Sequence, residues 1–215
     1  MSEIDRARRE LVDYSGRLLT DGLCMGTSGN ISVRIGDQVF ITPSSIPAAD
    51  MTPELIAETD LEGRVVEAST RPSTELPFHT AIYNGTDAGA VVHTHSMYAT
   101  ALSTTIDELP AIHYMINHVG GPVRVVPYCT FGTEELAHRV RAGVKDRFAT
   151  LIQNHGTVAY GATLAEAYFR AQLLEWLSEL YWRALQVGTP RILSEAELAD
   201  VREQNQRLRY AWSQR

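Results

Sequence analysis

The stretch VVHTHSMY at residues 91–98 begins as an apolar β-strand and then places two histidines two positions apart. Side chains at positions i and i+2 of a strand point to the same face, so His93 and His95 can direct their ring nitrogens at one point. This spacing is typical of metal ligands, but one hydrogen-bonded core histidine beside a surface histidine gives the same pattern. The stretch therefore predicts a buried strand and raises a metal site as a hypothesis.

A third histidine strengthens the metal hypothesis. His155 stands in NHG directly after the apolar run ATLIQ, where Gly156 allows a close backbone approach at the end of a strand. Three neutral imidazoles with an open position are typical of a catalytic zinc site rather than of a closed structural one. The other histidines lie in helical or loop patterns and are interpreted as structural: His79, His113, His118 and His138.

Glu75, in PSTELPFH, is the candidate for moving protons at such a site. It lies where a helix is expected to start, and the N–H groups and dipole of a helix start favour a carboxylate. The local pattern alone favours a capping box behind Pro72 and Ser73. Beside a metal, Glu75 could instead occupy the fourth coordination position and then act as a base.

Three short polar segments gather hydroxyls, small residues and glycine at the ends of expected elements: GTSGN at 26–30, TPSSIP at 42–47 and RPSTE at 71–75. Each segment alone is typical of a turn. Together with the histidines they indicate an anion-binding surface built from backbone and hydroxyl donors, which can hold phosphate without lysine.

The pattern of apolar residues predicts strands and helices that alternate along the chain. Strands are expected at 30–35, 38–42, 64–68, 89–93, 124–128, 149–153 and 157–161. Helices are expected at 4–18, 51–57, 73–83, 97–103, 133–145, 164–185 and 195–208. Because adjacent hairpins occur, the α/β fold is expected to contain a mixed or antiparallel sheet covered by helices, in a single domain over residues 1–215.

Composition narrows the classes of function. The chain has 215 residues, a net charge of −7 and two cysteines. Without a basic cluster, this charge argues against a nucleic-acid or anionic-membrane surface. The charged start MSEIDRARRE, the lack of a run of about 18 apolar residues and the absence of a disulfide framework predict a soluble cytoplasmic protein.

The ordered motifs GTSGNISVR, ITPSSIP, PSTELPFH, VVHTHS, AIHYMI, YCTFGT and LIQNHG resemble the class II aldolase and epimerase family, which includes the adducin head. The resemblance covers nearly the whole chain. It implies a three-layer α/β/α fold with a central mixed, mainly antiparallel sheet. It also implies a homotetramer with active sites at subunit interfaces, and metal-dependent cleavage of a deoxy-ketose 1-phosphate.

The resemblance assigns roles to particular residues. It implies one zinc ion per subunit on His93, His95 and His155, with Glu75 as acid/base and resting fourth ligand. It implies that Tyr114 carries a proton on the aldehyde side, that Tyr114 and Tyr210 reach the site across a subunit interface, and that Phe131 is a pocket wall. The implied contacts to substrate phosphate and hydroxyls are Gly29, Asn30, Ser44, Ser45, Ser73 and Thr74.

Two positions depart from the family pattern, and related activities stay open. Ser45 stands where glycine is common and Thr74 where serine is usual. Alternatives within the family are a pentulose-5-phosphate 4-epimerase, a methylthioribulose-1-phosphate dehydratase and an aldolase for 5-deoxyribulose 1-phosphate. The epimerases typically have aspartate at the position of Glu75, so glutamate favours an aldolase. A silent module like the adducin head lacks the histidines, and the residues alone also permit a zinc hydrolase.

Overall fold

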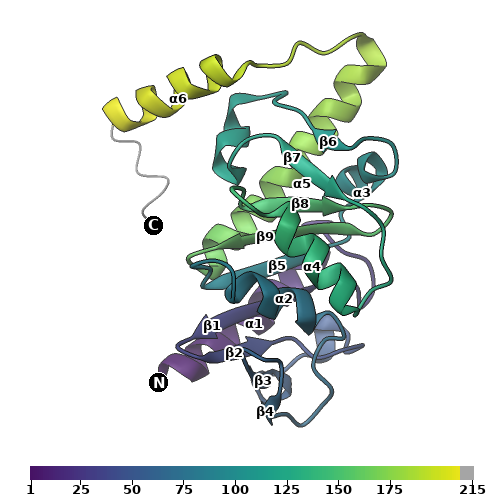
Figure 1. Ribbon diagram of the computed structural model, residues 1–215. Coiled ribbons are helices and arrows are strands. Elements are labelled where there is room, and N and C mark those ends of the chain that lie inside the picture. The colour runs from purple at the N-terminus through teal and green to yellow at the C-terminus, as the bar shows by residue number, and fades with distance from the viewer. Residues whose placement is uncertain (209–215) are drawn as a thin grey trace.

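The computed structural model describes residues 1–208, and its strands in that range form one sheet. The strands are β1 (Asn30–Ile35), β2 (Gln38–Ile41), β3 (Ala57–Asp60), β4 (Val65–Glu67), β5 (Ala90–Thr94), β6 (Glu108–Leu109), β7 (Val123–Val126), β8 (Ala149–Ile152) and β9 (Gly156–Gly161). Their order is β4-β3-β2-β1-β5-β9-β8-β7-β6 (Figure 1). β7 and β8 are parallel and the other neighbours antiparallel, so the predicted mixed, mainly antiparallel sheet is confirmed.

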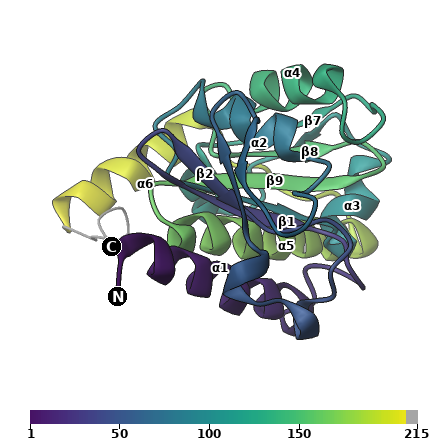
Figure 2. The same cartoon turned by 90° about the horizontal axis from the view of Figure 1, so that it is seen from below.

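Helices cover both faces of the sheet, as Figure 2 shows. On one face lie α1 (Glu3–Thr20), α3 (Met97–Ser103) and α5 (Leu164–Val187), and on the other α2 (Leu76–Tyr83) and α4 (Glu134–Gly143). Each face buries its own apolar core against these helices. α6 (Glu195–Arg207) extends outward beyond them (Figure 1). The predicted three-layer α/β/α arrangement is confirmed.

Strand β5 lies at the centre of the sheet and is buried on both faces. Val91 packs into the core beneath α2 and α4, whereas Val92 packs into the core beneath α1 and α5. Because side chains alternate along a strand, His93 lies on the face of Val91. Its ring contacts that of Phe78 in α2, with 5.3 Å between the centroids. The strand thus brings His93 to the α2 side of the sheet.

The N-terminal helix and hairpin follow their predicted patterns. Ser2 and Asp5 form a capping box at the start of α1, which satisfies otherwise unpaired N–H groups. β1 and β2 are joined by the Gly36-Asp37 turn, in which Gly36 has a φ of 60°. This turn is the one expected between two antiparallel strands.

Some elements differ from those predicted from the sequence. Residues 51–57 form no α-helix but contain the 3-10 turn η2 (Pro53–Leu55), preceded by η1 (Ala48–Asp50). Ala57 then begins β3, a strand that the sequence patterns did not predict. This segment is extended because pairing with β2 satisfies its backbone hydrogen-bonding groups. β6 was not predicted either. The helix expected from residue 73 begins at Leu76, so Glu75 lies at its boundary.

No helix within residues 1–208 combines the length and the apolar character that a bilayer-spanning segment requires. Cys24 and Cys129 are free thiols, in agreement with the expectation that they form no disulfide framework.

Candidate active site

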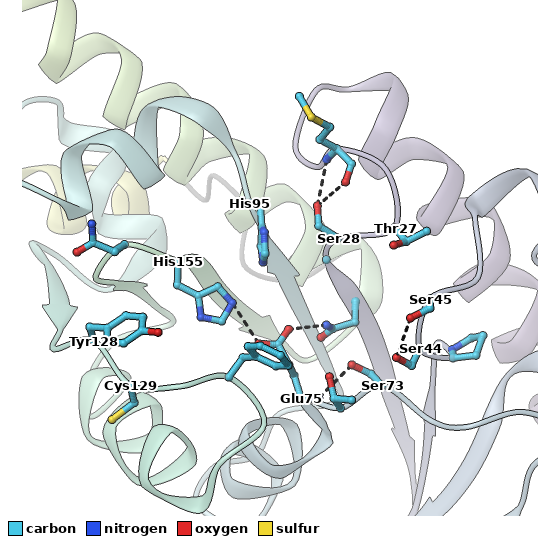
Figure 3. A pocket seen from close by; sticks show the side chains of 17 residues that line it. Thr27, Ser28, Ser44, Ser45, Ser73, Glu75, His95, Tyr128, Cys129 and His155 are labelled. Carbon is cyan, nitrogen blue, oxygen red and sulfur yellow. Dashed lines mark hydrogen bonds and ion pairs between the residues drawn. The ribbon is translucent and has the colours of Figure 1, made fainter.

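Four side chains from separate parts of the chain converge at one end of the central strands. His93 is the penultimate residue of β5, His95 directly follows that strand, His155 lies between β8 and β9, and Glu75 precedes α2. Their potential ligand atoms all lie within 4.8 Å of one another. Nε2 of His93 is 2.9 Å from Nε2 of His95. The Glu75 carboxylate lies 3.1 Å from Nε2 of His93. It also lies 3.1 Å from Nε2 of His155 (Figure 3).

Strand pairing explains why residues so distant in sequence meet. β5 and β9 are antiparallel with Thr94 opposite Thr157, so the end of β5 lies beside the start of β9. A Cβ on Gly156 would lie 2.1 Å from the carbonyl oxygen of Thr94, which is too close for any side chain. Gly156 therefore allows the approach that places His155 beside His95.

The hydrogen bonds of the cluster leave acceptor atoms facing one another. Nδ1 of His93 donates to the carbonyl oxygen of Thr157 at 2.8 Å, so Nε2 of the neutral ring carries a lone pair. This lone pair faces His95 and Glu75, and Oε1 of Glu75 has no hydrogen-bond partner within residues 1–208. Lone pairs this close require a shared proton or a cation. Three imidazoles and one carboxylate are a donor set that fits a divalent metal such as zinc.

Burial and mutual interactions shift the protonation of the cluster. Burial, and then repulsion by His93 and His155, lower the pKa of His95 to about 3, which keeps its ring in the neutral form that binds metals. Burial would raise the pKa of Glu75, but the two adjacent imidazoles outweigh burial and lower it. Burial would lower the pKa of His93, but the Glu75 carboxylate raises it. A bound cation would stabilise the ionised carboxylate in the same way.

The capping-box interpretation of Glu75 is wrong. Glu75 is the N-cap residue of α2, and its side chain makes no hydrogen bond to the helix. Its Oε2 instead accepts a hydrogen bond from Nδ2 of Asn30 at 2.9 Å. Oγ of Ser73 accepts the backbone N–H of Glu75 at 3.2 Å. The carboxylate points into the cluster because Asn30 and the histidines hold it there.

A pocket of about 560 Å³ opens beside the cluster. In Figure 3, Ser44, Ser45 and Ser73 lie on one side of Glu75, and Tyr128 lies on the other. The three polar segments thus form one wall. All the residues predicted to contact phosphate and hydroxyls line the pocket, namely Gly29, Asn30, Ser44, Ser45, Ser73 and Thr74.

Ser45 adopts a backbone conformation that favours glycine, with a φ of 61°. This geometry explains in physical terms why glycine suits the position in related sequences. Serine retains the same left-handed turn, at the cost of local strain, and its Oγ lies 3.4 Å from that of Ser44. The pocket wall at Ser45 therefore has a backbone conformation that is strained for serine.

The three aromatic residues that the family resemblance assigned to the site are not found together. Phe131 lines the pocket, with its side chain 62 % exposed. Tyr114 is 48 % exposed and lines a separate hollow with residues of α6. Tyr210 lies outside the described residues.

Several residues at or behind the pocket were missed by sequence reasoning. Met25, Tyr128, Cys129 and Asn154 line it. Tyr128 and Cys129 lie within the motif YCTFGT, Asn154 lies within LIQNHG, and Met25 directly precedes GTSGN, which was the available signal. His79 was interpreted as a structural histidine. It is fully buried in α2, and its ring nitrogens lie 2.7 Å from Oγ of Ser32 and 2.6 Å from Oδ1 of Asn30.

Comparisons with known proteins relate the fold and the site to a family. The family model for the class II aldolase and adducin N-terminal domain matches residues 9–182. The chain is 42 % identical over 198 residues to a 5-methylthioribulose-1-phosphate/5-deoxyribulose-1-phosphate aldolase of Rhodospirillum rubrum, covering 91 % of this chain and 89 % of that protein. It is 40 % identical over 204 residues to the L-fuculose phosphate aldolase of Escherichia coli K12, covering 94 % of each.

A solved structure of an L-fuculose 1-phosphate aldolase is also similar, with a TM-score of 0.91 and 34 % identity. The match covers 96 % of this chain and 98 % of that one. Sequence and fold agree over most of the chain. This chain therefore belongs to the class II aldolase and adducin N-terminal domain family.

Proposed function

We propose that this chain is a zinc-dependent class II aldolase that reversibly cleaves a deoxy-ketose 1-phosphate, such as L-fuculose 1-phosphate, to dihydroxyacetone phosphate and an aldehyde such as L-lactaldehyde. Family membership and the names of the relatives support the aldolase reaction. The observation that carries the proposal is the convergence of three imidazole nitrogens and one carboxylate beside a hydroxyl-lined pocket. Lys145 is the only lysine of the chain and does not line this pocket, which argues against Schiff-base catalysis.

In this proposal His93, His95 and His155 hold one zinc ion per subunit, with Glu75 as the fourth ligand before substrate binds. The ion supplies Lewis-acid chemistry that stabilises negative charge developing on the ketose carbonyl oxygen. The chain itself orients one of these imidazoles and keeps another neutral. The carbonyl group of Thr157 orients His93, and burial keeps His95 uncharged.

The polar wall is the proposed site of the substrate phosphate. Hydroxyl groups of Ser44, Ser45, Ser73 and Thr74 face the pocket together with the backbone of Gly29. Gly29 has a φ of 78°, and a Cβ there would lie 2.2 Å from Sγ of Cys24 and 3.0 Å from the carbonyl oxygen of His93, so this position favours glycine. Hydroxyl and N–H donors of this kind bind phosphate without a cationic side chain.

Two groups are proposed to move protons. In the cleavage direction, the partner subunit's Tyr114 takes the proton of the C4 hydroxyl as the C3–C4 bond breaks. The electron pair of that bond passes to the C2–C3 part of the substrate. Glu75, which has taken up a proton from solvent, delivers that proton to C3 to complete dihydroxyacetone phosphate, and Tyr114 returns the C4 hydroxyl proton to solvent. Oε1 of Glu75 suits this role because no hydrogen bond within residues 1–208 occupies it.

A homotetramer with active sites at its subunit interfaces is part of the proposal. The family resemblance supports it, and so does the position of Tyr114, which is half exposed and lies outside the pocket of its own chain. Tyr210 and the pocket residue Phe131 are proposed to complete the aldehyde side. A cytoplasmic location remains a prediction from the scarcity of cysteine.

A second substrate is favoured by a specific observation. The Rhodospirillum rubrum relative is named for 5-methylthioribulose 1-phosphate and 5-deoxyribulose 1-phosphate, and its identity to this chain is similar to that of the fuculose enzyme. These ketose 1-phosphates share the dihydroxyacetone phosphate part and differ only in the aldehyde part. Cleavage of 5-deoxyribulose 1-phosphate is therefore the second candidate.

The experiment is a comparison of purified protein on L-fuculose 1-phosphate, 5-deoxyribulose 1-phosphate and 5-methylthioribulose 1-phosphate, with dihydroxyacetone phosphate as the measured product. We expect turnover that is lost with chelator and restored by zinc, with one substrate preferred in kcat/KM. Turnover that persists in metal-free protein would contradict the assigned zinc. Release of no dihydroxyacetone phosphate from any of the three would contradict the proposed reaction.

A further inference from the structure

A chain of buried polar groups runs from the interior of the protein to Glu75. The hydroxyl of Tyr83 lies 2.7 Å from Oγ of Ser32, which lies 2.7 Å from Nδ1 of His79. Nε2 of His79 lies 2.6 Å from Oδ1 of Asn30, and Nδ2 of Asn30 lies 2.9 Å from Oε2 of Glu75. Every one of these side chains is buried. The chain links α2 to β1 behind the metal cluster.

The chemistry of the groups fixes the direction of every hydrogen bond. An ionised carboxylate only accepts, so the Asn30 amide must present Nδ2 to Glu75 and Oδ1 to His79. His79 must then donate from Nε2. Burial lowers the pKa of His79 to about 3, so its ring is neutral and Nδ1 must accept. Ser32 therefore donates to His79 and accepts from Tyr83.

Reversing any bond in this chain would set two acceptors or two donors against each other. A flipped Asn30 amide would turn Oδ1 toward the Glu75 carboxylate and Nδ2 toward the N–H of His79. An Nδ1–H tautomer of His79 would set the lone pair of Nε2 against Oδ1 of Asn30 and leave that oxygen without a donor. The orientation of Asn30 thus depends on the tautomer of His79.

We propose that His79 is a positioning residue for the acid/base Glu75. As the Nε2–H tautomer it locks the Asn30 amide, which holds Oε2 of Glu75 as an acceptor and leaves Oε1 free to face His155. The inference rests on the proposed function of Glu75 and extends it into the core. His79 touches neither the substrate pocket nor the metal-ligand atoms, so it acts only through Asn30.

The test uses a matched pair of variants at position 79. His79→Gln places an amide N–H where Nε2 of the imidazole stood, whereas His79→Met has similar length and no donor. We expect kcat in His79→Met to fall roughly 10–100-fold, as is found when groups behind a catalytic shell are removed. We expect KM to change little and His79→Gln to recover most of kcat. Equal losses in both variants would overturn the proposal.

A stability control separates positioning from damage to the core. Thr150→Val removes the hydrogen bond from Oγ1 of another fully buried residue to the carbonyl oxygen of Arg124 at 2.9 Å, in a different part of the sheet. We expect it to lower the melting temperature without lowering kcat. If Thr150→Val lowers kcat as much as His79→Met does, the effect of His79 is general destabilisation and the proposal fails.

A spectroscopic readout does not depend on turnover. In metal-free protein labelled with [15N]histidine, the His79 signals are identified by their loss in His79→Gln. We expect the nitrogen shifts and couplings of an Nε2–H tautomer at neutral pH. An Nδ1–H or doubly protonated ring would overturn the proposal. This measurement needs no substrate, so it tests the tautomer of His79 even if the protein cleaves no ketose phosphate. Failure to cleave those substrates would contradict the proposed function alone.

Discussion

The two ends of the active-site pocket are built in different ways. At the inner end, the histidines and Glu75 are held by central strands and α2, and His93 is 0 % and Glu75 7 % exposed. At the outer end, Met25, Tyr128 and Phe131 are 79 %, 57 % and 62 % exposed. One folded chain therefore completes the inner end, whereas the outer end is open, and in the proposed function it receives the substrate and residues of a second subunit.

In the proposed function, residues of the inner end carry out the reaction, whereas residues of the outer end select the substrate. The groups that would hold the metal and move the proton at C3 are rigid because strand register and buried hydrogen bonds define them. The groups that would meet the aldehyde are exposed and few. This arrangement agrees with relatives that bear aldolase names for different ketose phosphates at similar identity.

The largest effect is expected from breaking the inner end. His155→Ala removes one of three imidazoles, so zinc content should fall and kcat should drop by about 1000-fold or more, since the proposed Lewis acid is lost. Metal analysis and dihydroxyacetone phosphate release measure both. His138→Ala is the matched control, because His138 is exposed on α4. A His155→Ala protein that keeps its zinc would contradict the assignment of His155 as a metal ligand.

Glu75→Gln tests the acid/base group with little change of shape. We expect kcat to fall by about 100- to 10,000-fold, the range for loss of a general acid or base. Exchange of a dihydroxyacetone phosphate C–H proton with deuterated solvent should fall with it, because this exchange uses the same proton transfer. Circular dichroism checks the fold. Exchange at the wild-type rate would assign the proton transfer to another group.

Tyr114→Phe tests whether the outer end is completed by a second chain. We expect kcat to fall by about 100-fold, since a proton carrier is removed. Dissociating and reassembling Tyr114→Phe together with His155→Ala should restore activity, because mixed oligomers contain sites with intact Tyr114 from one chain and intact His155 from the other. No recovery in oligomers shown to be mixed would mean that Tyr114 does not act across an interface.

The stability of the folded protein should depend on pH through the buried His79. His79 has a folded pKa of about 3 against 6.5 in the unfolded chain, so the unfolded state binds more protons between these values. Its contribution to the free energy of unfolding is full above pH 6.5 and is lost as pH falls. At pH 5 the loss should be on the order of 2 kcal/mol. Urea unfolding of metal-free wild type should therefore weaken more on acidification than that of His79→Gln, and parallel slopes would contradict this.

The smallest effect is expected at the pocket wall. Ser45→Gly relieves a left-handed residue, worth roughly 1 kcal/mol, but the freedom of glycine in the unfolded chain offsets part of this gain. We expect KM to change by less than about threefold, because the backbone donors keep their positions. Ser45→Ala, which keeps the strain and removes the hydroxyl, separates the two contributions. A tenfold change in KM for Ser45→Gly would show that the serine reshapes the phosphate site.

Much of the inner end could be predicted because it follows from local rules. The apolar run before His93 predicts a buried strand, and alternation along a strand places His93 and His95 on one face. Gly156 after His155 signals close backbone approach, which the structure shows against Thr94. The capping box at Glu75 was wrong for the opposite reason: the pattern is local, but its partners Asn30, His93 and His155 are distant in sequence.

The local patterns of the sequence predicted a sheet covered by helices, a set of side chains for a divalent metal and three segments for an anion. How these parts are connected depends on the tertiary structure. It turned Glu75 away from its helix, joined it through Asn30 to the buried His79, and kept Tyr114 outside its own pocket. The physical reason is that strand pairing and buried hydrogen bonds act between residues far apart in the chain, where no local pattern records their partner.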